Sequence, residues 1–100
     1  MKPHKVYFKT MIVEKSPQTV FTPLEDGSGV LLNLQTLFYY NLNRTGAALW
    51  QEIERTNQPT LNSLIEAICQ RFDVSEDGAR NEILAFIERL KEFKMIRVIE

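Results

Sequence analysis

The sequence has only one cysteine and one histidine among its 100 residues, and this scarcity excludes several kinds of site. A single cysteine, Cys69, excludes an internal disulfide and any zinc site built on cysteine pairs. The histidine, His4, stands next to the amino terminus, and no base is placed to activate a nucleophile. The four glycines match neither a P-loop nor a dinucleotide fingerprint. We therefore predict no enzymatic activity, no catalytic residue, no metal and no cofactor.

Long apolar runs and an excess of one charge are also missing. No apolar run approaches the roughly 18 residues that a membrane span requires, and no signal-type segment follows the first residues. We therefore expect a cytoplasmic protein. The 12 basic and 13 acidic side chains give a net charge of −1, and no stretch concentrates the cations. Duplex DNA binders obtain most of their affinity from such a basic face, so this balance does not favour them.

The pattern of the sequence changes once, near Asn43, from segments typical of strands to segments typical of helices. Three β-prone segments separated by turn residues predict an antiparallel meander. They are residues 19–24, 30–34 and 38–42. Pro23 indicates that the first of them lies at a sheet edge or a bulge. We expect one domain over residues 1–100, in which residues 1–17 form either a further strand or a loosely held arm.

Three helices are predicted after the strands, each beginning at a capping side chain: Asn43, Thr60 and Ser75. Apolar residues repeat along each helix at the spacing of one face, which we expect to lie in the core. These stripes are Leu42, Gly46, Leu49, Trp50 and Ile53; Leu61, Leu64, Ile65, Ile68 and Phe72; and Ala79, Ile83, Phe86, Leu90 and Phe93. Cys69 adjoins the second stripe, and we expect it to be a small buried hydrophobe.

The third helix has a second stripe beside the first, formed by Arg80, Leu84, Ile87 and Lys91. Leu84 lies about 100° around the helix from Ile83, so the two cannot both point into one small core unless another element covers Leu84. Two interpretations stay open. The stripe binds a partner, or an N-terminal strand or the closing segment 95–99 covers it.

The aromatic run Phe38-Tyr39-Tyr40 has no basic residue interleaved with it, so it is not typical of a nucleic-acid stacking platform. The simplest interpretation is a strand that packs Phe38 and Tyr40 inward and Tyr39 outward. A strand at the edge of a sheet also offers unpaired N–H and C=O groups to an extended peptide. The two interpretations are compatible.

Several segments resemble the PqqD-like family over about residues 19–97. They are Leu31 to Thr36, Tyr39-Tyr40, Leu42 to Ala47 with Trp50, and Phe72 to Val74. The resemblance implies a winged-helix-like α+β fold, with a three-stranded antiparallel N-terminal sheet followed by three helices. It also implies a non-catalytic protein that captures the leader segment of a ribosomally synthesised precursor peptide by β-strand addition. Such proteins present the leader to a modifying enzyme, such as a radical SAM maturase or a peptidase.

In the family the leader lies between the third strand and the third helix. Carried onto this sequence, the resemblance makes the peptide-binding residues Phe38, Tyr39, Tyr40, Asn41, Leu42, Arg80, Leu84, Ile87 and Lys91. Leu37 stands where the family commonly has glycine, and leucine would be strained at positive φ, so we expect this hairpin to turn differently. Features of the pyrroloquinoline quinone branch are missing, so we expect a substrate from another peptide pathway.

Two functions of other classes stay open as alternatives. One is a winged-helix DNA-binding regulator, although the second helix has Arg71 as its only cation and the third mixes cations with acids. The other is an assembly module, because a free strand edge can also pair with a second copy of the chain or exchange strands with it.

Overall fold

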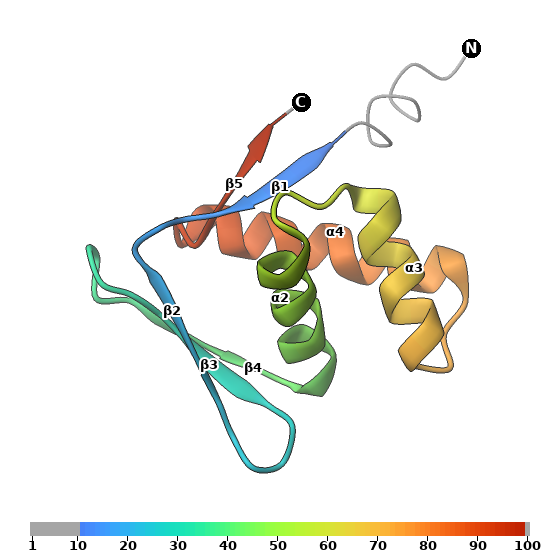
Figure 1. Ribbon diagram of the computed structural model, residues 1–100, viewed down its shortest axis with the longest axis horizontal. Coiled ribbons are helices and arrows are strands. Elements are labelled where there is room, and N and C mark those ends of the chain that lie inside the picture. The colour runs from blue at the N-terminus through green and yellow to red at the C-terminus, as the bar shows by residue number, and fades with distance from the viewer. Residues whose placement is uncertain (1–10, 100) are drawn as a thin grey trace.

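The computed structural model describes residues 11–99, which form two antiparallel sheets and three helices (Figure 1). The elements in chain order are β1 (Ile12–Lys15), β2 (Thr19–Pro23), β3 (Gly29–Asn33), β4 (Tyr39–Leu42), α2 (Arg44–Thr56), α3 (Leu61–Arg71), α4 (Glu76–Glu92) and β5 (Ile96–Ile99). The predicted α+β class, with an antiparallel three-stranded sheet ahead of three helices, is confirmed. The structure adds a second sheet that the sequence analysis did not specify.

The second sheet joins the two ends of the described chain. Strand β1 pairs antiparallel with β5, with Val13 opposite Val98 and Glu14 opposite Arg97. Arg97 forms an ion pair with Glu14, and hydrogen bonds from Arg97 and Gln58 hold the pKa of the Glu14 carboxyl below its usual value. For residues 1–17 we considered a further strand or a loosely held arm, and residues 12–15 form a strand. His4 lies outside the described residues.

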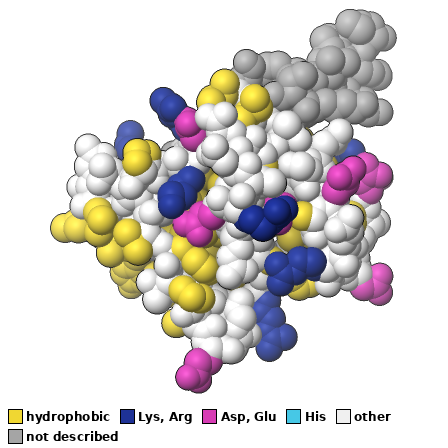
Figure 2. All heavy atoms as spheres, in the orientation of Figure 1, with side chains coloured by type: hydrophobic (Ala, Val, Ile, Leu, Met, Phe, Trp, Pro, Cys, Tyr) yellow, Lys and Arg dark blue, Asp and Glu magenta, His cyan; other side chains and the backbone are white. Residues whose placement is uncertain are grey.

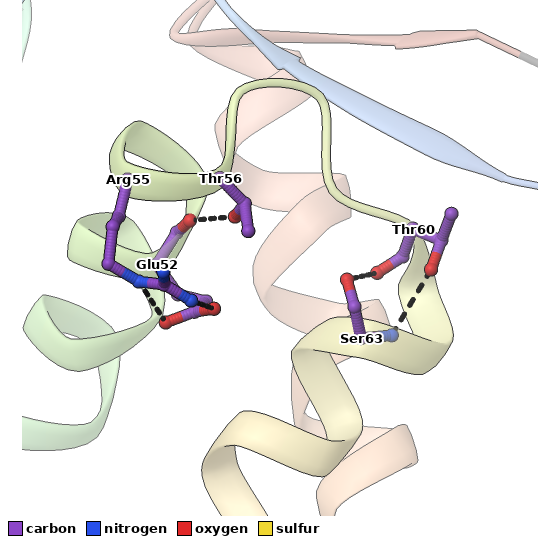
Figure 3. A network of polar contacts seen from close by, with 5 residues as sticks. All are labelled: Glu52, Arg55, Thr56, Thr60 and Ser63. Atoms are coloured by element: carbon purple, nitrogen blue, oxygen red, sulfur yellow. Dashed lines mark hydrogen bonds and ion pairs between the residues drawn. The ribbon is translucent and has the colours of Figure 1, made fainter.

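All three predicted N-caps are confirmed. Asn43 Oδ1 accepts a hydrogen bond from the Gly46 N–H at 2.8 Å, and Ser75 Oγ accepts one from the Gly78 N–H at 3.0 Å. At α3, Thr60 Oγ1 accepts from the Ser63 N–H at 3.1 Å (Figure 3). Each side chain satisfies a backbone donor that the first helical turn leaves without a partner, which fixes where the helix begins.

Short-range polar contacts stabilise the two helix ends on either side of the connection between α2 and α3 (Figure 3). The Ser63 hydroxyl donates to the Thr60 carbonyl at 2.8 Å, and the Thr56 hydroxyl donates to the Glu52 carbonyl at the end of α2. Arg55 pairs with Glu52 on the exposed surface. Between these ends the chain turns through Asn57 and Gln58, both at positive φ, and the two helices pack against each other.

The core lies where the helices meet each other and the inner faces of the sheets. The predicted stripe of α2 is fully buried, and that of α3 is buried except for Phe72, which is half-buried. The largest fully buried side chains include Trp50, Leu31, Leu49, Ile53, Leu64, Ile68, Ile83, Ile87 and Leu90. Cys69 packs against this core and is half-buried, so it is less covered than predicted.

The two faces of the three-stranded sheet differ in burial. Leu31 is opposite Tyr40 and Gly29 is opposite Leu42, and this face packs on the core. Tyr39 points to the other face and is 67% exposed, as predicted. Phe38 lies just before β4 and packs against Phe93 as Tyr40 does, but it is 56% exposed, so it is much less covered than predicted.

The hairpin between β3 and β4 turns through four residues, Leu34 to Leu37. The Leu37 N–H donates to the Asn33 carbonyl at 2.7 Å, and Leu37 has a φ of 65°, in the left-handed region. The expectation that leucine would force a different turn is therefore wrong. The Asn33 side chain holds the start of the loop by accepting from the Gln35 and Thr36 N–H groups, so the loop keeps its shape and Leu37 is strained.

We predict that Leu37→Gly raises the free energy of unfolding by about 0.5–1 kcal/mol. Glycine removes a left-handed strain of about 1–2 kcal/mol, and part of that gain is offset by its larger freedom in the unfolded chain. Leu37 is 71% exposed, so little packing is lost. Urea titration measures the change. Leu34→Gly, in the same loop at negative φ, is the control and should lower stability; a rise in both variants would contradict the strain.

Candidate functional site

Strand β4 has a partner on one side only. The order of the sheet is β2-β3-β4, and within residues 11–99 no strand pairs with the outer edge of β4 (Figure 1). The other two strands of the molecule, β1 and β5, pair with each other in a separate sheet. The described ends of the chain therefore leave this edge open.

The hydrogen-bonding pattern identifies which backbone groups of β4 face this open edge. The Asn33 N–H donates to the Phe38 carbonyl at 2.9 Å, so these opposed residues bond across β3 and β4. Because bonded and non-bonded pairs alternate in an antiparallel ladder, Tyr40 and Leu42 also direct their backbone groups toward β3. The N–H and C=O groups of Tyr39 and Asn41 consequently point outward, where an added strand would meet them.

The opposite edge of the sheet, on β2, has fewer free backbone N–H groups for an added strand. Gln18 bonds with Leu34 of the hairpin, so by the same alternation the residues of β2 that face outward are Thr19, Phe21 and Pro23. Proline has no N–H, and the Thr19 N–H already donates to the Ser16 carbonyl at 3.1 Å. Edge strands are commonly protected in this way against pairing with other chains. Of the two edges of this sheet, only that of β4 lacks such protection. The position of Pro23 on an edge strand confirms the prediction.

The open edge also lacks charge. Only two of the 28 residues from Ser16 to Asn43 are charged, although the whole chain has 25 charged residues, and both lie in the turn between β2 and β3. Hydrophobic side chains gather at the end of the molecule formed by the hairpin (Figure 2). The exposed ones in this part of the sheet are Val20, Leu34, Leu37, Phe38 and Tyr39. A strand that approaches β4 therefore meets no charged side chain from the sheet itself.

A groove of about 280 Å³ runs beside β4 and between it and α4. Its walls are β4 and one face of α4, and the start of α2 lies between them. The lining residues are Tyr40, Asn41, Leu42, Asn43, Thr45, Gly46, Leu49, Glu82, Ala85, Phe86 and Arg89. The middle of the groove is apolar, and its charged residues are Glu82 and Arg89. It contains no histidine, cysteine or paired carboxylates, so its chemistry suits binding.

Gly46 keeps the elements of the groove close together. A Cβ atom at this position would lie 3.3 Å from Leu42 Cδ2 and 3.4 Å from Phe86 Cε1. These distances are tighter than most Cβ contacts, so a side chain at this position would require Leu42 or Phe86 to shift. The φ of Gly46 is not in the left-handed region, so glycine is favoured here by close packing.

Aromatic contacts join the carboxyl end of α4 to β4. The ring of Phe93 packs edge-on against Phe38, with centroids 6.0 Å apart, and against Tyr40 at 5.7 Å. The Arg89 guanidinium donates to the Tyr40 hydroxyl at 3.3 Å. Tyr40 therefore lines the groove where β4 meets α4, and Phe38 packs on Phe93 beyond this end of the groove. Tyr39 and Asn41 contribute backbone groups at the edge.

The stripe of α4 predicted as the wall of the groove lies elsewhere, which corrects the sequence analysis. Ile87 is 1% exposed and belongs to the core, and Leu84 is half-buried against it. Arg80 pairs with Glu76 and Asp77, and Lys91 pairs with Glu88. At about 100° per residue, this stripe is centred roughly 180° around the helix from the face that lines the groove.

The residues of α4 that do line the groove were missed in the sequence, although they follow a regular pattern. Glu82, Ala85, Phe86 and Arg89 stand at i, i+3, i+4 and i+7, which places them on one helix face. Phe86 was assigned to the core, and it is in fact half-buried. The buried residues of α4 are Ala79, Ile83, Ile87 and Leu90. Compared with the predicted core stripe, the buried face is turned toward Ile87, and Phe86 therefore lies at its edge on the side of the groove.

Two buried polar side chains fix the sheet against the end of α4. Asn33 is 1% exposed, and its Nδ2 donates to the Lys94 carbonyl at 2.8 Å. Thr19 is 3% exposed, and its hydroxyl donates to the Met95 carbonyl at 3.2 Å. Both acceptors lie in the turn after α4, where Lys94 has a φ of 59° and the Met95 N–H donates back to the Leu90 carbonyl at 2.8 Å.

Other kinds of site find no support in the described part of the chain. Across residues 11–99, no three His, Cys, Asp or Glu side chains are grouped so that they could hold a metal ion. None of the helices described there is both long and apolar enough to cross a membrane. The groove beside β4 is thus the site on which a function can be built.

Comparison with known proteins finds one matching family model and two solved structures of similar fold. The family model described as Coenzyme PQQ synthesis protein D (PqqD) matches residues 28–96, which include β4, α2 and α4. The structure of TbiB1 in complex with the TbiA(beta) leader peptide is similar with a TM-score of 0.76 and 23% identity, covering 84% of this chain and 94% of that one. Lasso peptide synthetase B1 complexed with the leader peptide has a TM-score of 0.72 and 21% identity, covering 85% and 96%. No curated protein sequence matches the chain.

We predict that Asn33→Ala lowers the free energy of unfolding by about 2–3 kcal/mol, because it removes the part-buried hydrogen bond to the Lys94 carbonyl and frees the hairpin loop. Thr19→Val is the matched variant and should cost only about 1 kcal/mol, since the Met95 carbonyl keeps its bond from the Ser16 N–H. Urea titration of both variants measures the losses. Equal losses would show that Asn33 is not the main anchor of the sheet.

Proposed function

The chain belongs to the PqqD family, and from this premise we propose that it is a non-catalytic protein that binds a peptide as an added strand on β4. The observation that carries the proposal is the unprotected edge of β4 beside a groove of about 280 Å³. An open edge supplies backbone hydrogen bonds, and a neighbouring groove supplies selectivity for side chains. In this chain the open edge and the groove lie side by side along β4.

The peptide that we propose is the leader segment of a ribosomally synthesised precursor. Both solved structures with a similar fold are complexes with leader peptides, and we extend that ligand class to this chain. The leader would bond to the outward N–H and C=O groups of Tyr39 and Asn41. Its alternate side chains would enter the groove over Phe86 and Leu49, and the remaining ones would lie on the outer face beside Tyr39.

We further propose that the bound leader is presented to a modifying enzyme, such as a radical SAM maturase or a peptidase, in the cytoplasm where precursors are made. The exposed apolar side chains around the hairpin, among them Leu34, Leu37 and Tyr39, would then remain available on the outer face. No feature of the groove favours the alternative of a DNA-binding regulator, because its two charged residues have opposite signs. Pairing of β4 with a second copy would compete with the leader for the same edge.

The test of this proposal removes one outward N–H of β4. A display library of random peptides, long enough to pair along all of β4, is panned against the protein to supply a probe. We predict that Asn41→Pro weakens binding of the selected peptide about tenfold or more, because a hydrogen bond at the edge is lost and the ring obstructs pairing. Calorimetric titration measures the dissociation constant.

Asn41→Ala is the matched control and should bind like the wild type, because it keeps the N–H. The Asn41 side chain is exposed and its N–H faces away from β3, so both variants should unfold at wild-type urea concentrations. If Asn41→Pro is folded and binds the peptide with unchanged affinity, or if the library yields no binder, strand addition to β4 is wrong.

A second variant tests the groove itself. Ala85 is exposed and lines the groove, so we predict that Ala85→Trp fills it and weakens binding of the selected peptide about tenfold, at unchanged stability. Gln70→Trp places the same side chain on an exposed position of α3 and is the control. Equal affinities of the two tryptophan variants would exclude the face of α4 from the binding site.

A further inference from the structure

The two charged residues of the groove are neither paired with each other nor engaged in other ion pairs. Glu82 and Arg89 stand seven residues apart on α4, and among residues 11–99 neither forms a salt bridge. The other cations of the α4 helix are occupied, since Arg80 pairs with Glu76 and Asp77, and Lys91 pairs with Glu88. The groove therefore has one negative side chain and one positive side chain that a ligand can pair with.

These two charges mark opposite ends of the groove because α4 runs antiparallel to β4. At one end, Arg89 donates to the Tyr40 hydroxyl, and Phe93 packs against Phe38 and Tyr40. At the other end, Phe86 lies against Gly46, next to Leu42. Residues early in β4 are thus near the carboxyl end of α4, and Glu82 lies one turn beyond Phe86, toward the end of β4.

A strand that adds antiparallel to β4 therefore runs in the same direction as α4. Antiparallel addition continues the arrangement of β2, β3 and β4 and is the more stable pairing per residue. The amino-terminal part of such a peptide lies near Glu82, and its carboxyl-terminal part lies near Arg89. The order of charges along the peptide is consequently fixed by the direction of the two elements.

The distance between Glu82 and Arg89 is similar to the distance spanned by three alternate residues of an extended peptide whose side chains point into the groove. Seven helical residues span about 10 Å along the axis of α4. Inward side chains of an extended peptide recur about every 6.7 Å, so three of them span about 13 Å. The middle position then lies over Ala85 and Phe86, where the groove is apolar, and the outer two lie near Glu82 and Arg89.

Resting on the proposed function, we propose that this chain selects leader segments in which three alternate residues are basic, apolar and acidic, in that order from amino to carboxyl end. The basic residue pairs with Glu82, the apolar residue contacts Phe86, and the acidic residue pairs with Arg89. Glu82 and Arg89 are thereby specificity-determining residues of the groove. Exposed ion pairs are weak individually, so each should change affinity about two- to fivefold, and both together about tenfold.

The test compares the peptides that different variants select from one random display library. The wild type should enrich acidic residues at the third inward position and basic residues at the first. Arg89→Glu should replace the acidic residue by a basic one, and the double variant Glu82→Lys with Arg89→Glu should reverse both charges. The apolar middle residue should be enriched in every case. Both positions are exposed, so the variants should stay folded.

A control outside the groove separates the charge of Arg89 from a general effect of charge on α4. Arg80→Glu reverses a cation on the side of α4 that faces away from the groove, and it should leave the selected peptides unchanged. A shift of the charge preference with Arg80→Glu would overturn the assignment to Arg89.

The outcomes also distinguish this inference from the proposed function. If the wild type and Arg89→Glu select the same charges, or if the acidic residue precedes the basic one, the inference is overturned. Strand addition then still stands as long as the selected peptides lose affinity for Asn41→Pro. If no variant selects any peptide, the proposed function fails and the inference fails with it.

Discussion

The hydrogen bond from the buried Asn33 amide to the Lys94 carbonyl is the contact on which the rest of this structure depends. It joins the hairpin that carries β4 to the turn that ends α4, and the same side chain also fixes the hairpin loop through two backbone N–H groups. The core packing of Leu31 and Leu42 and the contacts of Phe93 with Phe38 and Tyr40 also hold the sheet against the helices. The side chain of Asn33 adds a directional hydrogen bond that links the shape of the hairpin to the end of α4.

The two edges of the sheet show how a protein directs strand addition to one side. Pro23 and the bonded Thr19 N–H protect β2, whereas Tyr39 and Asn41 leave the edge of β4 open and uncharged. An open edge is a hazard for a soluble chain because it also pairs with unrelated strands. Of the two edges of the three-stranded sheet, the one left open is the one with a groove beside it. Such an arrangement is expected where pairing with another chain is the function.

Much of the fold could be predicted from local patterns, and the error in the site has a physical cause. Asn43, Thr60 and Ser75 cap helices by contacts within a few residues, so the sequence alone locates them. The buried face of α4 has Phe86 on one side and Leu84 on the other, and the groove forms on the side that turns toward β4. Helical periodicity locates the buried face but does not show which of its two sides faces β4. Leu37 is a similar case. Leucine disfavours the positive φ that this turn requires, and the hydrogen bonds of the Asn33 side chain to the loop stabilise the turn in spite of that.

The central claim is that β4 receives an extended peptide at its open edge, and amide hydrogen exchange followed by NMR tests it most directly. In the free protein the amides of Tyr39 and Asn41 should exchange fast, while those of Tyr40 and Leu42, bonded to β3, are protected. Saturating the protein with a display-selected peptide should slow exchange at Tyr39 and Asn41 strongly and leave the other two nearly unchanged. A bound peptide that leaves Tyr39 and Asn41 as fast as before would contradict the account.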